Sequence, residues 1–282
     1  FINSNMFNCL SNNPYRIIGV PSNAGLKKIQ KNLSVFKAYS KIGKKQKSDY
    51  DLACFNFSEI DRRQEVMESV ESKILLDENK IKYSLYWFTD SNAYDSVALK
   101  SLFDSNSEKA EQIWDKSTKG KKIGKKNISS FNNYSSLLLF NELNYSKNDQ
   151  FNKTKTSIDS IRKALNIKID LINSEFFNEF CQLNGSSKKI DSNGMKSFLA
   201  ESILDILKKN YNDKDLAKLS RGLNESLSTL ILIKISEKPI QELNTIIAGF
   251  DRKLESNSDK NSKNISSKQG LDIGIELVKE TK

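Results

Sequence analysis

Few residues in this chain of 282 amino acids are of the types that carry out catalysis, and His is absent altogether. Imidazole is the side chain most often used as a general base and as the partner of a Cys nucleophile. Cys9, Cys54 and Cys181 lie far apart, form no CxxC pair, and are too few to hold zinc without His. The sequence therefore predicts no catalytic residue, no metal site and no cofactor.

Carboxylates are abundant, but their close pairs lie in polar sequence contexts. Glu68 with Glu71, and Asp213 with Asp215, fit a solvated helix face or a turn better than an acid–base pair. We therefore expect that the protein is not an enzyme.

The remaining candidate functional residues are mostly lysines, whose positive charge suits the binding of anionic partners. The formal net charge is +10, from 45 Lys and Arg against 35 Asp and Glu. One basic segment follows Phe36, and a second, KSTKGKKIGKK, spans 116–126. Candidate partner-binding residues in the first segment are Lys37, Lys41, Lys44, Lys45 and Lys47, and candidate nucleic-acid contacts in the second are Lys119, Lys121, Lys122, Lys125 and Lys126.

The segment 116–126 also has the composition of a solvated, mobile loop, because like charges repel and Gly disfavours a helix. Gripping phosphates is the alternative. The segment has no Gly-x-x-x-x-Gly-Lys-Ser/Thr arrangement, so it is not a nucleotide-binding loop of that kind. The excess charge of the chain is nearly all Lys, whereas nucleic-acid surfaces usually carry Arg and interleaved aromatic residues.

The first basic segment continues a stretch with a clear helical pattern. Tyr15, Ile17 and Ile18 form an apolar cluster, which the turn-forming residues 19–24 end. Apolar residues then recur in steps of three or four, which predicts a helix with one buried face. They are Leu26, Ile29, Leu33, Phe36 and Tyr39.

This stretch resembles the J-domain of the DnaJ-type co-chaperones. Residues 15–20, Tyr-Arg-Ile-Ile-Gly-Val, match the family's opening Tyr-x-Ile-Leu-Gly-Val, and 59–88 resemble its third and fourth helices. Lys41-Ile42-Gly43 stands where the family has His-Pro-Asp, the tripeptide that stimulates ATP hydrolysis by the heat-shock chaperone ATPase. The resemblance implies a degenerate, J-like helical domain that does not stimulate that ATPase.

Two arginines lie near the predicted start of the third helix. Arg62 and Arg63 are placed to bind an acidic partner segment, since the guanidinium group suits carboxylates. Pairing with Glu59 or Glu65 inside the fold is the alternative. The predicted packing face of this helix consists of Ile60, Val66, Val70, Ile74 and Leu75.

The chain as a whole is predicted to be all-α, because only eleven Gly and three Pro interrupt it and no strand alternation is sustained. The predicted parts are an N-terminal extension at 1–12, the J-like domain at 13–88, a linker at 89–95, helical hairpins at 96–254, a polar linker at 255–269, and the start of a further helix at 270–282 that the end of the chain truncates.

The hairpin region is expected to be either tetratricopeptide-like or an irregular α-bundle. Its first hairpin covers 96–116. A helix over 129–144 and one long helical stretch over 157–183 follow, and the pattern restarts from Asp191. Pro239 begins a later helix at its first turn.

The expected function is that of a non-enzymatic, chaperone-like adaptor that binds a protein partner. The alternative is a basic nucleic-acid-associated protein of a mobile-element or phage-defence system. No apolar run approaches the roughly 20 residues that span a bilayer, and no signal segment opens the chain. Together with the three scattered Cys, which favour a reducing compartment, this predicts a cytoplasmic bacterial protein.

Overall fold

The computed structural model describes residues 9–10, 12–55, 57, 59–143, 155–207 and 212–235. Every regular element in these ranges is a helix, which confirms the all-α prediction. The chain divides into two units, Phe1–Ile206 and Leu207–Lys282. The helix predicted from Pro239, the polar linker at 255–269 and the helix start at 270–282 lie outside the described residues.

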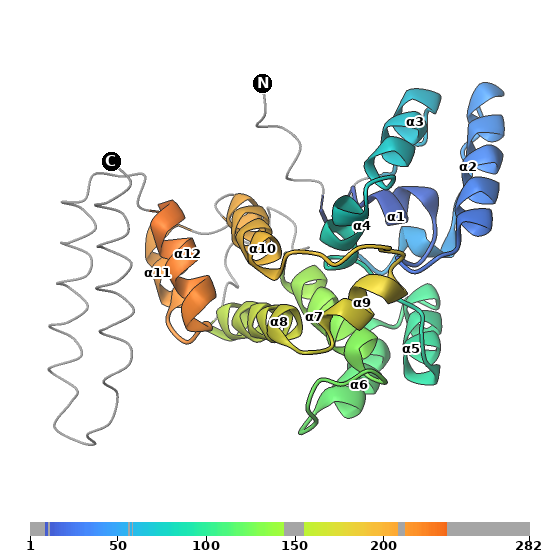
Figure 1. The fold of residues 1–282 in the computed structure, drawn as a ribbon. Helices are drawn as coiled ribbons and strands as arrows, with labels where there is room; N and C mark the ends of the chain where they lie inside the picture. The colour runs from blue at the N-terminus through green and yellow to red at the C-terminus, as the bar shows by residue number, and fades with distance from the viewer. Residues whose placement is uncertain are drawn as a thin grey trace, which may run out of the picture. The chain divides into compact units, whose positions relative to one another are not determined.

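The helices of the first unit are drawn from blue to yellow in Figure 1. They are α1 (Pro14–Ile18), α2 (Leu26–Lys41), the 3-10 helix η2 (Asp49–Asp51), α3 (Gln64–Lys73), α4 (Asp77–Ser84), α5 (Ala93–Phe103), α6 (Ser107–Thr118), α7 (Ile128–Leu143), α8 (Lys155–Asn173), α9 (Phe177–Leu183) and α10 (Ser192–Leu207). The described helices of the second unit are α11 (Asp213–Ser220) and α12 (Glu225–Ile235).

The short helix α1 has sharp boundaries that the sequence encodes. Asn13 caps its first turn by accepting a hydrogen bond from the Tyr15 N–H, and Pro14 occupies the first helical position. Gly19 ends the helix with φ +73°, and a Cβ at this position would lie 2.5 Å from the Ser48 hydroxyl. α1 is wholly buried and packs against both α2 and α3.

The predicted apolar faces of α2 and α3 are confirmed only in part. Ile29, Leu33 and Phe36 are buried on α2, but Leu26 and Tyr39 at its two ends are exposed. Leu75 was assigned to the packing face of α3 and is 69% exposed, which corrects that prediction. It follows the end of α3, where the chain has left the helical path that would turn it inward.

Residues 84–89, which we call the buried segment, run from the end of α4 towards α5 without any exposure to solvent. The Trp87 indole N–H donates to the Val20 carbonyl oxygen, 2.9 Å away. The Phe88 ring stacks on Trp114 of α6, with the ring centroids 5.4 Å apart. The Tyr86 hydroxyl is 2.5 Å from the Ser202 hydroxyl on α10. The segment therefore contacts the α1 turn, the α5–α6 hairpin and α10.

Only the start of the buried segment makes helix-like hydrogen bonds: the Leu85 N–H donates to Ile81, and the Tyr86 and Trp87 N–H groups close short turns. The rest of its backbone needs other partners. Asn132 of α7 donates both of its amide hydrogens, to the carbonyl oxygens of Ser84 and Trp87, each over 2.9 Å. The Asn133 amide accepts from the Thr89 N–H at 2.8 Å and donates to the Thr89 carbonyl at 2.7 Å. Two neighbouring Asn of α7 thus replace the missing backbone partners.

Lys168 of α8 completes this network from the other side. Its amine is fully buried and donates to the Leu85 carbonyl oxygen and to the Ser136 hydroxyl. Burial without a carboxylate among these partners lowers the pKa of Lys168 well below its ordinary value.

Asp95 ties α5, α6 and α7 together from a fully buried position. Its carboxylate accepts from the Trp114 indole N–H at 3.0 Å and from the hydroxyls of Ser129 and Ser130 at 2.5 and 2.8 Å. Desolvation raises the pKa of Asp95, and these donors oppose that shift.

The segment 89–95 does not behave as the predicted linker. Thr89 and Asp95 are fully buried, and the division between the two units falls between Ile206 and Leu207 instead. The two ends of the segment are polar because Thr89 and Asp95 hydrogen-bond within the core, whereas Asp90, Ser91 and Tyr94 between them are exposed.

The helical hairpins follow the predicted order with one difference. α5 and α6 form the first hairpin with Ala110 and Trp114 buried, and α7 and α8 pack side by side. The stretch 157–183, predicted as continuous, is interrupted at 174–176 between α8 and α9. The Ser174 hydroxyl donates to the Leu171 carbonyl oxygen there, which competes with continuation of the helix.

Within the described part of the chain, no helix is both long enough and apolar enough to cross a membrane.

Replacing Asn132 by Ala should destabilise the first unit by about 2–4 kcal/mol. The buried Trp87 carbonyl loses its side-chain partner, the Ser84 carbonyl keeps only its bond from the Trp87 N–H, and a small cavity forms. Urea unfolding followed by tryptophan fluorescence measures this, since Trp87 and Trp114 both lie in the first unit. Asn178→Ala on the exposed face of α9 is the control and should change stability by less than about 0.5 kcal/mol. Equal stability of both variants would show that the Asn132 hydrogen bonds contribute little.

Candidate functional site

The structure brings four of the candidate partner-binding residues around one hollow of about 390 Å³. The hollow lies where the C-terminal part of α2 and the loop after it meet residues 59–63. Lys44, Lys45, Arg62 and Arg63 line it, together with Phe36 and Ser40 among others. Lys37, Lys41 and Lys47 do not line the hollow.

Arg62 holds the fold together and is not available to a partner. Its side chain is 9% exposed and forms an ion pair with Asp51 of η2. It also donates to the carbonyl oxygens of Ile17 and Gln46, each over 2.8 Å, and lies 4.3 Å above the Phe36 ring. The sequence offered Glu59 or Glu65 as its internal partner, and the structure corrects this to Asp51. The guanidinium fixes the loop after α2 against α1.

The remaining candidates differ in whether they have an acidic partner. Arg63 pairs with Asp61 at the surface over 2.7 Å, and this arginine lowers the pKa of the Asp61 carboxyl. Lys37 pairs with Glu71 of α3 over 2.8 Å, and Lys45 pairs with Glu59 over 2.6 Å.

The lysines without an acidic partner lie along α2 and the loop after it. Between Leu26 and Ser48 the chain has eight Lys and no Asp or Glu. Apart from Lys37 and Lys45, none of these lysines forms an ion pair within the described ranges. We call them the α2 basic surface, and all are exposed: Lys27, Lys28, Lys31, Lys41, Lys44 and Lys47.

Apolar side chains accompany these lysines on the same helix. Val35 and Tyr39 lie four residues apart and share one face of α2, and Ile42 is the residue that caps the end of this helix. Their exposed fractions are 37%, 38% and 64%. A surface that combines positive charge with exposed apolar groups has the composition of a protein-binding surface.

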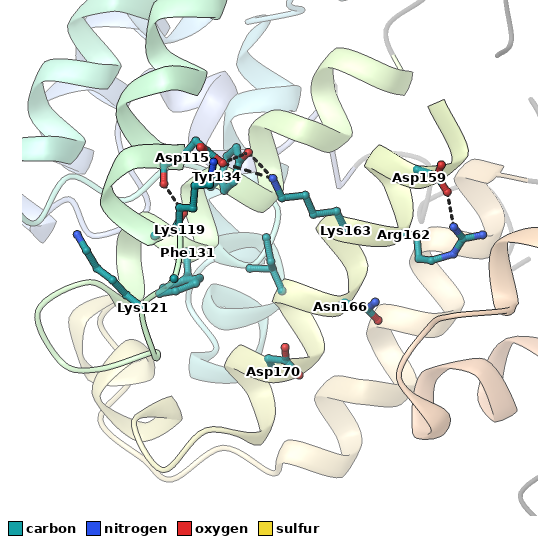
Figure 2. Close-up of a pocket in the computed structure, with 13 residues that line it drawn as sticks. Asp115, Lys119, Lys121, Phe131, Tyr134, Asp159, Arg162, Lys163, Asn166 and Asp170 are labelled. Atoms are coloured by element: carbon teal, nitrogen blue, oxygen red, sulfur yellow. Dashed lines mark hydrogen bonds and ion pairs between the residues drawn. The ribbon is translucent and has the colours of Figure 1, made fainter. Parts of the chain in front are cut away.

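The second basic segment lies beside a groove of about 670 Å³, shown in Figure 2. Lys119 and Lys121 line the groove from the loop after α6, whereas the exposed Lys122, Lys125 and Lys126 do not line it. Arg162 and Lys163 line it from α8. These two residues were not among the candidates predicted from the sequence, because a groove shared by residues 119 and 163 depends on how α7 folds back between them.

Lys163 is fixed in this groove by two oxygen atoms. Its amine lies 2.6 Å from the Tyr134 hydroxyl and 3.4 Å from an Asp115 carboxylate oxygen. The Tyr134 hydroxyl donates in turn to Asp115 over 2.8 Å. This hydrogen bond and the nearby Lys163 lower the pKa of Asp115, whereas burial, together with Asp115, raises the pKa of Tyr134.

Neither hollow contains an evident reaction centre. A lysine with a lowered pKa can act as a nucleophile, but Lys168 is fully buried and lines neither hollow. No three His, Cys, Asp or Glu side chains in the described part of the chain are grouped so that they could hold a metal ion. The two hollows instead offer charged and polar groups suited to binding.

Comparison of the chain with protein-family models, curated proteins and solved structures finds no match in any of the three. The resemblance to the J-domain therefore stays a prediction, and functional reasoning rests on the geometry of this chain.

Arg62 and Arg63 provide a matched pair for testing the division between structural and surface residues. Arg62→Ala should destabilise the first unit by about 3–5 kcal/mol, because Asp51 and two carbonyl groups lose a partner that is nearly buried. Arg63→Ala should change stability by less than about 0.5 kcal/mol, since its ion pair is exposed. Urea unfolding measures both. A small effect of Arg62→Ala would contradict the structural role given to this residue.

Proposed function

We propose that the protein is a non-enzymatic, chaperone-like adaptor of the cytoplasm, and that α2 docks on an acidic surface of a protein partner. The observation that carries this proposal is the α2 basic surface, whose exposed lysines have no acidic partner within the described ranges. Unpaired charges of one sign steer association with a partner of the opposite sign. The exposed Val35, Tyr39 and Ile42 add apolar contact area to the same helix.

The J-domain resemblance supports a chaperone context for this adaptor. α1 packs against α2 and α3, and Lys41-Ile42-Gly43, at the end of α2 and the start of the loop after it, stands in place of His-Pro-Asp. The adaptor would therefore bind without stimulating ATP hydrolysis by a heat-shock chaperone ATPase. Arg62 is nearly buried and fixes the loop from inside, so we expect the exposed lysines to make the contacts with the partner.

Site-specific cross-linking tests the proposal in the cell. A photo-reactive amino acid at Ser34, which is exposed on α2, should capture a distinct acidic protein, whereas the same group at Asn178 on α9 should not. Lys41→Glu combined with Lys44→Glu should then weaken binding of the purified partner by about tenfold or more, because attraction becomes repulsion.

Lys188→Glu combined with Lys189→Glu is the control for that double variant, since it makes the same change in net charge at an exposed site away from α2. Its affinity for the partner should stay within about twofold of the original protein. The proposal fails if Ser34 captures no protein, or if both double variants weaken binding equally. Stimulated ATP hydrolysis by a chaperone partner would contradict the inactive state of the J-like loop.

Nucleic-acid binding by a mobile-element or phage-defence protein is the alternative that the sequence left open. Of its candidate contacts, Lys119 and Lys121 line the groove beside α8, and Lys122, Lys125 and Lys126 are exposed nearby. The groove is therefore the place at which that chemistry can be tested.

A further inference from the structure

The groove between the loop after α6 and α8 gathers positive charge from two separate elements. Lys119 and Lys121 line it from the loop, and Arg162 and Lys163 line it from α8. Figure 2 shows Lys163 turned toward Tyr134 and Arg162 paired with Asp159. Residue 120 between the two loop lysines is Gly with φ +69°, a conformation that lets the chain turn sharply there. Both lysines line the groove, and the Lys121 amine also lies 3.4 Å from the Lys116 carbonyl oxygen and 5.8 Å from the centre of the Tyr94 ring.

Two of the three carboxylates that line the groove have a cationic neighbour. Asp159 forms an ion pair with Arg162, and Asp115 accepts from the Tyr134 hydroxyl and lies near the Lys163 amine. Asp170 also lines the groove, about two turns further along α8 than Lys163. Lys119 and Lys121 form no ion pair with a described residue, so they leave positive charge uncompensated at the loop side.

Lys163 is the oriented donor of the groove. An ammonium group has three N–H donors. The Tyr134 hydroxyl and Asp115 are the two acceptors that the described residues provide for it. A third N–H remains for an oxygen atom of a ligand. Because Tyr134 is buried beneath it, Lys163 is held in place before any ligand arrives.

From this arrangement we propose that the groove binds a phosphate group, with Lys119 and Lys121 supplying charge and Lys163 supplying an oriented hydrogen bond. The phosphate group belongs either to a free nucleotide or to a nucleic-acid strand, which present the same oxygen atoms to the protein. The site is independent of the α2 basic surface, and either proposal can fail without the other.

Titration of the full chain at low salt tests this inference with pyrophosphate, ATP and a fluorescent oligothymidylate as probes. Lys119→Glu combined with Lys121→Glu should weaken binding by about tenfold or more. Lys122→Glu combined with Lys125→Glu makes the same change in net charge within the same loop, but these two residues do not line the groove. This control should stay within about threefold of the original affinity.

Lys163→Gln gives a second variant with no change in the loop, and it should also weaken binding by about tenfold. Circular dichroism checks that each variant folds. Competition between probes then distinguishes the two sources. Displacement of the oligothymidylate by stoichiometric ATP identifies a nucleotide site, whereas a steep decrease of affinity with salt and no such displacement identifies a strand.

Three results would overturn the inference. They are the absence of binding by all three probes at low salt, equal weakening by the two double variants, and unchanged affinity in Lys163→Gln. Binding that depends only on the total charge of the loop would mean that the groove is not a site.

Discussion

The first unit depends on how the buried segment satisfies its backbone hydrogen bonds. After Ser84, the last residue of α4, this segment carries three large aromatic side chains into the core without forming a regular helix. Unpaired polar groups at such positions would offset a large part of the free energy that burial of the aromatic rings contributes. Asn132, Asn133 and Lys168 supply the missing partners from α7 and α8. The N-terminal helices and the helical hairpins are thereby joined into one unit.

The basic residues fall into two kinds according to whether their charged groups bind partners within the fold. Lys168 and Arg62 stabilise the fold, since Lys168 donates to the buried segment and Arg62 fixes the loop after α2. The lysines of the α2 basic surface have no such partner in the described ranges and keep their charge at the surface. Positive charge that contributes little to the fold is free to contribute to binding, which is the basis of the proposed adaptor function.

The sequence predicted the helices well, because apolar periodicity and caps are local signals. The turn at Gly19 and the buried Ile29, Leu33 and Phe36 of α2 were predicted correctly for this reason. The role of residues 89–95 was predicted wrongly, since Thr89 and Asp95 have the composition of a linker and their partners on α7 are distant in sequence. The groove beside α8 was missed for the same reason. Polar residues reveal their function only through contacts that are distant in sequence.

The central structural claim is that the buried segment joins the N-terminal helices and the hairpins into one cooperative unit. Hydrogen–deuterium exchange measured by mass spectrometry tests it most directly. Peptides covering 84–89 should exchange as slowly as those from α7, because both open only when the whole unit unfolds. Exchange of 84–89 at the faster rate of an exposed loop such as 119–126, with α7 still protected, would contradict the claim.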